Sequence, residues 1–289
     1  MERYYLCGKW FVIFESEKGY IMKYYAKFLL LAVGFSIILY GLRSYMSADG
    51  LSIQHYIVYN HCGELIKFTT AEMVLRIRNL LPYYTYAIIF STYIYRHFCY
   101  SSVYIFSRCQ KRGWWFRGEA VKLLGYTVIY VILLNISALP IVMMRYQISI
   151  DNVGVKFLVV HILVMSLWLY GITIFANILA ILFGSKVMVI GTFLLQILLF
   201  MSVGNVSVGE TKITKILKIK FNLNFNMQML PALHKFRGMN KDIIDGLGIS
   251  IKYQWSVLYM LIVNVIIIAI GTVIINRIDI IDTNKEEVD

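Results

Sequence analysis

Long apolar stretches constrain this chain more than any other feature of its sequence. A helix needs about 20 mostly apolar residues to cross the hydrocarbon core of a bilayer. Hydrophobic residues make up 59% of the chain and charged residues 15%, whereas a soluble domain carries about 25% charged residues. The sequence therefore predicts an all-α integral membrane protein with about six transmembrane helices, at 24–45, 80–98, 121–143, 155–183, 187–204 and 255–275.

The fourth and fifth apolar stretches are separated only by Gly184, Ser185 and Lys186. A single helix of about fifty residues would be about 75 Å long, far more than a bilayer requires. We therefore expect the chain to turn back at these three residues and to form a tight helical hairpin.

The whole chain, 1–289, is expected to form one transmembrane domain. Its first segment, 1–23, places Leu6, Trp10, Ile13 and Phe14 on one side of a helical wheel. This pattern is compatible with a short interfacial helix; an ordinary frayed terminus is the alternative.

Basic residues predict the orientation in the membrane. The loop at 99–120 carries Arg108, Lys111, Arg112 and Arg117, and short basic loops face the cytoplasm. With six spans, both termini, including the tail 276–289, would then be cytoplasmic and the protein would be a multi-pass protein of the cell membrane. The segment 205–254 would be extracytoplasmic, although it is also basic, which opposes this orientation.

The net charge of +12 is carried largely by such loops. Loops beside membrane spans meet anionic lipid headgroups, which attract Lys and Arg. We therefore expect membrane lipid, and not nucleic acid, to be the partner of this charge.

Apolar and polar residues alternate almost regularly from Lys218 to Met229. Alternation with a period of two is typical of a strand. The sequence thus predicts either a short extracytoplasmic β segment or an irregular interfacial segment here, and it does not separate the two.

No enzyme motif stands out. The sequence lacks G-x-x-x-x-G-K-[ST], H-E-x-x-H and G-x-S-x-G, which are typical of P-loop ATPases, zinc proteases and serine hydrolases. No spacing of Cys and His typical of a metal site occurs either. We expect no catalytic residues and no metal site.

Two sets of side chains could line a substrate path. The second apolar stretch carries an aromatic stripe with helical spacing, and other stretches carry polar residues that avoid lipid by facing the bundle interior. Helix packing and interhelical hydrogen bonds are the alternative role for both sets. The stripe is Tyr83, Tyr86, Phe90 and Tyr93, and the polar residues are Asn135, Asn177, Gln196 and Asn264.

The order of these features resembles the membrane permeases of type-2 ABC exporters. The likeness consists of an interfacial N-terminal segment, six spans, a tight hairpin of spans four and five, and a longer segment before span six. Its most specific part is Tyr104-Ile105-Phe106-Ser107-Arg108 followed by Gln110-Lys111-Arg112-Gly113-Trp114-Trp115, which looks like the cytoplasmic coupling helix of that family and its basic turn.

This resemblance implies that the chain works with a separate ABC ATPase subunit, which would bind ATP and Mg, and with a second permease in a homodimer or heterodimer. The residues expected to dock on the ATPase are Tyr104, Arg108, Lys111, Arg112 and Trp115. The cargo would be a peptide, an antibiotic or a lipid-like substrate. A membrane protein without cargo, acting in immunity, as a scaffold or as a sensor, is the alternative.

Overall fold

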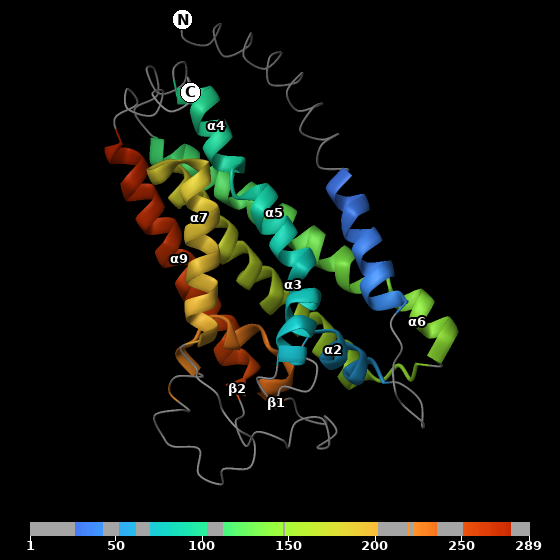
Figure 1. The fold of residues 1–289 in the computed structure, drawn as a ribbon. Coiled ribbons are helices and arrows are strands. Elements are labelled where there is room, and N and C mark those ends of the chain that lie inside the picture. The colour runs from blue at the N-terminus through green and yellow to red at the C-terminus, as the bar shows by residue number, and fades with distance from the viewer. Residues whose placement is uncertain are drawn as a thin grey trace, which may run out of the picture.

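The structure, a computed structural model, describes residues 27–42, 52–61, 70–102, 112–146, 148–201, 219, 222–235 and 251–278. These residues form a helical bundle (Figure 1). The helices are Lys27–Gly41, whose end Ser36–Gly41 is π-helical, α2 (Ile53–His61), α3 (Thr70–Phe90), α4 (Tyr93–Ser102), α5 (Arg112–Ile136), α6 (Leu139–Tyr146), α7 (Asn152–Met201) and α9 (Tyr253–Arg277).

Three helices in the described part of the chain are long and apolar enough to cross a membrane: Arg112–Tyr146, Asn152–Leu199 and Tyr253–Arg277. They contain the predicted spans 121–143, 155–183, 187–204 (up to Leu199) and 255–275. The predicted spans 24–45 and 80–98 fall on the helix Lys27–Gly41 and on the pair α3–α4, and neither combines that length with that apolarity among the described residues. The predicted helical class is confirmed, and these three helices indicate a membrane protein.

The predicted turn between the fourth and fifth stretches is present at Gly184, whose φ of 82° and ψ of 167° interrupt α7. A Cβ atom at Gly191 would lie 3.5 Å from Leu179 Cδ1. These two residues would be about 18 Å apart along a continuous helix, so α7 must fold back on itself. Its two arms pack through Ala176, Ala180 and Met188.

Two further helices are interrupted without a reversal of the chain. The turn Ser91–Thr92 separates α3 from α4, and the turn Ser137–Ala138 separates α5 from α6. Proline explains the second break: Pro140 has no N–H group and its ring excludes the carbonyl four residues earlier, which is that of Ile136, the last residue of α5.

One end of the bundle is covered by short elements (lower end of Figure 1). Here α2 lies beside the two 3-10 turns Met227–Met229 and Pro231–Leu233, and strands β1 (His234–Lys235) and β2 (Ile251–Lys252) pair in parallel, with His234 opposite Ile251. At the other end, Arg112 Nη1 donates to the Ile278 carbonyl at 2.8 Å and joins the start of α5 to the end of α9.

The strand predicted over 218–229 is wrong for the described residues of that segment. Residues 222–223 are helical, 225–226 form a turn, and 227–229 form a 3-10 turn. The asparagines explain the difference, because their amides make turns and contact another helix. Asn224 Oδ1 accepts from the N–H groups of Asn226 (2.9 Å) and Met227 (3.2 Å), and Asn224 Nδ2 donates to the Leu199 carbonyl (2.6 Å). The short β pair lies elsewhere, at β1 and β2.

Candidate functional site

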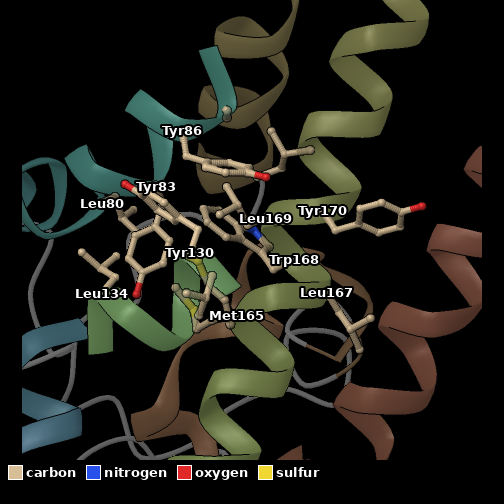
Figure 2. Packing of buried hydrophobic residues seen from close by; sticks show 14 of the residues in the cluster. Leu80, Tyr83, Tyr86, Tyr130, Leu134, Met165, Leu167, Trp168, Leu169 and Tyr170 are labelled. Carbon is tan, nitrogen blue, oxygen red and sulfur yellow. The ribbon is translucent and has the colours of Figure 1, made fainter. Parts of the chain in front are cut away.

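The predicted aromatic stripe forms the buried centre of the bundle. Tyr83, Tyr86 and Phe90 of α3 are at most 4% exposed. Tyr86 stacks on Phe90 with ring centroids 4.4 Å apart and tilts against Tyr130 of α5 at 4.6 Å, and Tyr83 meets the edge of Trp168 of α7 at 6.2 Å. Figure 2 shows Tyr83, Tyr86, Tyr130 and Trp168 gathered between α3, α5 and α7. Packed in this way, the stripe fills the interior of the bundle.

The hydroxyl groups of this aromatic centre are all used in the packing. Tyr130 donates to the Pro82 carbonyl at 2.8 Å, and Tyr86 shares a hydrogen bond of 3.0 Å with Thr127. Asn135, a predicted path residue, donates to Tyr83 Oη at 3.3 Å and to the Val131 carbonyl at 2.8 Å. Buried polar atoms therefore hold α3 against α5.

Asn177 of α7 supplies hydrogen bonds to backbone groups at the break between α3 and α4. Its Oδ1 accepts from the Ile94 N–H at 2.7 Å, and its Nδ2 donates to the Phe90 carbonyl at 2.8 Å and to the Thr173 carbonyl at 2.8 Å. Phe90 and Ile94 flank the turn where the helical hydrogen bonds are interrupted. The side chain of one helix thus replaces backbone hydrogen bonds of another, which an apolar environment requires.

Asn264 of α9 is also buried, and it joins α9 to α7 by donating from Nδ2 to the Leu167 carbonyl at 2.9 Å. The two helices approach closely there. A Cβ atom at Gly171 would lie only 2.6 Å from Asn264 Oδ1 and 2.8 Å from the Phe225 ring.

A buried carboxylate that the sequence did not indicate lies near the start of α5. Glu119 is 5% exposed. Its Oε2 accepts from the Tyr93 hydroxyl at 3.0 Å and lies 3.7 Å from His97 Nδ1, and its Oε1 accepts from Lys122 Nζ at 2.6 Å. Tyr93, the last residue of the predicted stripe, therefore joins α4 to α5. The signal in the sequence was the spacing of Glu119 and Lys122, three residues apart on one helix face.

The docking residues are only partly described. Tyr104, Arg108 and Lys111 lie outside the described residues. Arg112 bonds to the Ile278 carbonyl, and Trp115 packs against Phe98 with ring centroids 6.4 Å apart, while the neighbouring Trp114 is 70% exposed. The start of α5 thus presents one tryptophan outward and turns Arg112 and Trp115 toward other helices of the same chain.

Gln196, the remaining path residue, lines a crevice between α3 and the two arms of α7. Thr192, one turn earlier, lines it too. Both residues are at least 91% buried, and the structure gives Thr192 Oγ1 and Gln196 Oε1 no hydrogen-bond partner. Of the predicted path residues, Gln196 therefore lines an open space in the described part of the chain.

A buried histidine closes the covered end of the bundle. His234 Nε2 lies 2.7 Å from Ser256 Oγ, which donates to Gln228 Oε1 at 2.7 Å, and Gln228 Nε2 donates to the Asn222 carbonyl at 2.8 Å. Burial lowers the pKa of His234 from 6.5 to about 4, and a hydrogen bond with the Leu230 backbone opposes part of this shift.

Among the described residues, no three His, Cys, Asp or Glu side chains gather as a metal site would require. Comparisons of the chain with protein-family models, with curated proteins and with solved structures found no match. The fold therefore defines the class, a helical protein with three helices able to cross a membrane, and no relative refines it.

Proposed function

We propose that this chain is the membrane-spanning permease subunit of an ATP-driven exporter. It would cross the cell membrane six times, with both termini in the cytoplasm, and move a peptide, an antibiotic or a lipid-like substrate. A separate ABC ATPase subunit would bind ATP and Mg, and a second permease would complete the transporter.

The observation that carries this proposal is the arrangement around the basic loop. Segment 103–111 joins the end of α4 to the start of α5, and the start of α5 lies against the end of α9. Trp114 is exposed there, and Arg108, Lys111 and Arg112 add positive charge. An exposed aromatic side chain with neighbouring basic residues is typical of a protein-binding surface, which supports docking of an ATPase at this end.

The hairpin of α7 also supports the proposal, because it matches the layout of spans four and five in type-2 ABC exporters. The breaks in α3–α4 and α5–α6 are of the kind that membrane transporters tolerate where other side chains restore the missing hydrogen bonds.

One observation favours the alternative, a membrane protein without cargo. The aromatic stripe fills the interior of the bundle formed by the described helices, where a central path would otherwise lie. A scaffold, an immunity protein or a sensor would need none.

The test is purification of the tagged chain from its native membranes in mild detergent, followed by mass spectrometry and an ATPase assay. We expect a P-loop ATPase in stoichiometric amount. Recovery of the intact chain without one would support the alternative.

Charge reversal then tests the docking surface. The double variant Arg108→Glu and Lys111→Glu should lose the ATPase, because it replaces attraction by repulsion at a close interface. Arg112 is unsuitable for this test, since its bond to Ile278 holds α5 to α9. Lys186→Glu, an exposed change at the α7 turn, is the matched control and should retain the ATPase.

A further inference from the structure

A crevice on the side of the bundle contains polar atoms that the protein leaves unsatisfied. It is lined by Ala87 and Ser91 of α3, by Ala176 of the first arm of α7, and by Met188, Thr192 and Gln196 of the second arm. Thr192 is 9% exposed and Gln196 is 3% exposed, and neither Thr192 Oγ1 nor Gln196 Oε1 has a hydrogen-bond partner among the described residues.

The crevice lies deep in the apolar part of the bundle. Thr192 and Gln196 follow Gly184 by eight and twelve residues, so along a helix they lie about 12 Å and 18 Å from the turn. Water is scarce at such a depth in a membrane, and an unpaired polar atom there is costly. A ligand that brings a hydrogen-bond donor would therefore be stabilised in this crevice.

The open side of the crevice faces apolar surroundings. Ile88 and Phe193 line it and are 42% and 36% exposed. The exposed surface of the second arm of α7 continues with Ile190, Leu194, Ile197 and Leu198. A molecule reaching the crevice from this side would come from within the membrane.

The space also limits the size and the charge of the group that enters. The cavity volume of the crevice is about 10 Å³. About 10–15 Å³ accommodates one water molecule, so only a small head group fits. No carboxylate lines the crevice, and a buried ammonium group without a counter-charge is strongly disfavoured.

We propose that this crevice binds the hydroxyl head group of a neutral, single-chain amphiphile that enters from the lipid bilayer. The hydroxyl donates to Gln196 Oε1 and accepts from the Thr192 Oγ1 hydroxyl, while the alkyl chain lies outside along Ile88 and Phe193. The site stands on the geometry of α3 and α7 and does not require an ATPase partner.

The test uses the purified full-length chain in phosphatidylcholine vesicles and a photoreactive probe, hexadecan-1-ol with a diazirine in its chain. Hexadecane with the same diazirine is the matched control. We expect the alcohol to label peptides that contain residues 84–91 and 188–193, to be displaced by excess hexadecan-1-ol, and to label them about tenfold more than the alkane. Tenfold is the factor expected for one hydrogen bond of ordinary strength.

Variants connect the labelling to the two polar side chains. Gln196→Leu should reduce labelling by the alcohol to the level of the alkane. Thr192→Val keeps the side-chain shape and should reduce labelling severalfold, and it serves as the test if Gln196→Leu fails to fold. Leu194→Val, a lipid-facing change on the same arm, should leave it unchanged. Equal labelling by alcohol and alkane, or labelling that both polar variants retain, would show that the crevice holds only a water molecule and would overturn the proposal.

A hexadecylammonium probe that labels more strongly than the alcohol would also overturn the assignment of a neutral head group. Because these measurements use the chain alone, they succeed or fail independently of the co-purification experiment.

Discussion

Acidification should loosen the covered end of the bundle through a single residue, His234. Its neutral imidazole is 5% exposed and shares a hydrogen bond with Ser256 of α9, and burial lowers its pKa to about 4. A folded-state pKa below the unfolded value means that the unfolded chain takes up the proton first. The stability that neutral His234 contributes is therefore fully present above about pH 6.5 and is lost as the pH falls toward 4.

The size of the effect follows from these two pKa values. Between pH 7.5 and pH 5 the unfolded chain gains almost one proton at this site and the folded chain gains about a tenth of one. Integrated over that interval, the free energy of unfolding falls by about 2 kcal/mol. At pH 6 the loss is about 0.8 kcal/mol by the same relation.

Thermal unfolding of the detergent-solubilised chain, followed by tryptophan fluorescence between pH 5 and 7.5, would measure this loss. His234→Gln keeps a hydrogen-bonding amide for Ser256 but cannot titrate, so it should abolish about 2 kcal/mol of the acid-induced loss. The control His55→Gln, which changes the partly buried histidine of α2, should behave like the wild type. If the His234→Gln variant loses as much stability on acidification as the wild type does, the titrating group lies elsewhere and the reasoning is wrong.

Three further changes test the packing and the orientation. Gly171→Ala should destabilise the chain by about 1–3 kcal/mol in thermal unfolding, because the new methyl group would lie 2.6 Å from a buried amide oxygen; Gly125→Ala, with nothing within 4 Å, is the control and should cost nothing. Asn177→Leu should cost about 3 kcal/mol in the same assay, since it leaves an N–H and a carbonyl unpaired at the break in α3–α4. On a cysteine-free background, an impermeant thiol reagent applied to intact cells should label a cysteine at the exposed position of Ile150 and not one at Trp114; the opposite result would invert the predicted orientation.

The sequence predicted the long helices well because their cause is local. A long apolar segment must be buried in a bilayer or in a protein core, and the number of its residues gives the length of the helix. The turn at Gly184 was predictable for the same reason: the run was too long for one helix, and the glycine accepts the positive φ of 82°.

The break at Ser91–Thr92 was not predictable, because nothing nearby in the sequence requires it. Neither residue is a proline or a glycine. The break is compensated by Asn177, more than eighty positions later, and only the packing of α7 against α3 and α4 reveals that pairing. A local pattern cannot show a hydrogen bond between distant segments.

The segment 218–229 failed for a related reason. A period of two reports only that apolar and polar residues alternate, and it assumes that the polar ones face water. Here the asparagine amides are buried, and they bond to the backbone of their own turn and to the last turns of α7. In this segment the alternation separates apolar side chains that pack from asparagine side chains that form hydrogen bonds, and the backbone is not extended.

The buried amides of this bundle differ in whether their oxygen atoms are paired. Asn135, Asn177 and Asn226 each satisfy a group on another element: a tyrosine of α3, the broken end of α3, and the backbone of α7. Each therefore has a structural use that explains its presence among apolar residues. Gln196 is as deeply buried, yet its Oε1, like Asn264 Oδ1, meets no donor among the described residues.

A leucine at position 196 would avoid that cost and would fill a similar volume. If Gln196 were needed for the fold, Gln196→Leu should destabilise the chain, whereas removal of an unpaired polar atom from an apolar site should stabilise it. If the side chain binds a ligand, the same change should remove the binding and also raise the melting temperature of the ligand-free chain. Measured together, stability and labelling distinguish a residue kept for the fold from one kept for a ligand: the proposal requires the first to rise while the second falls.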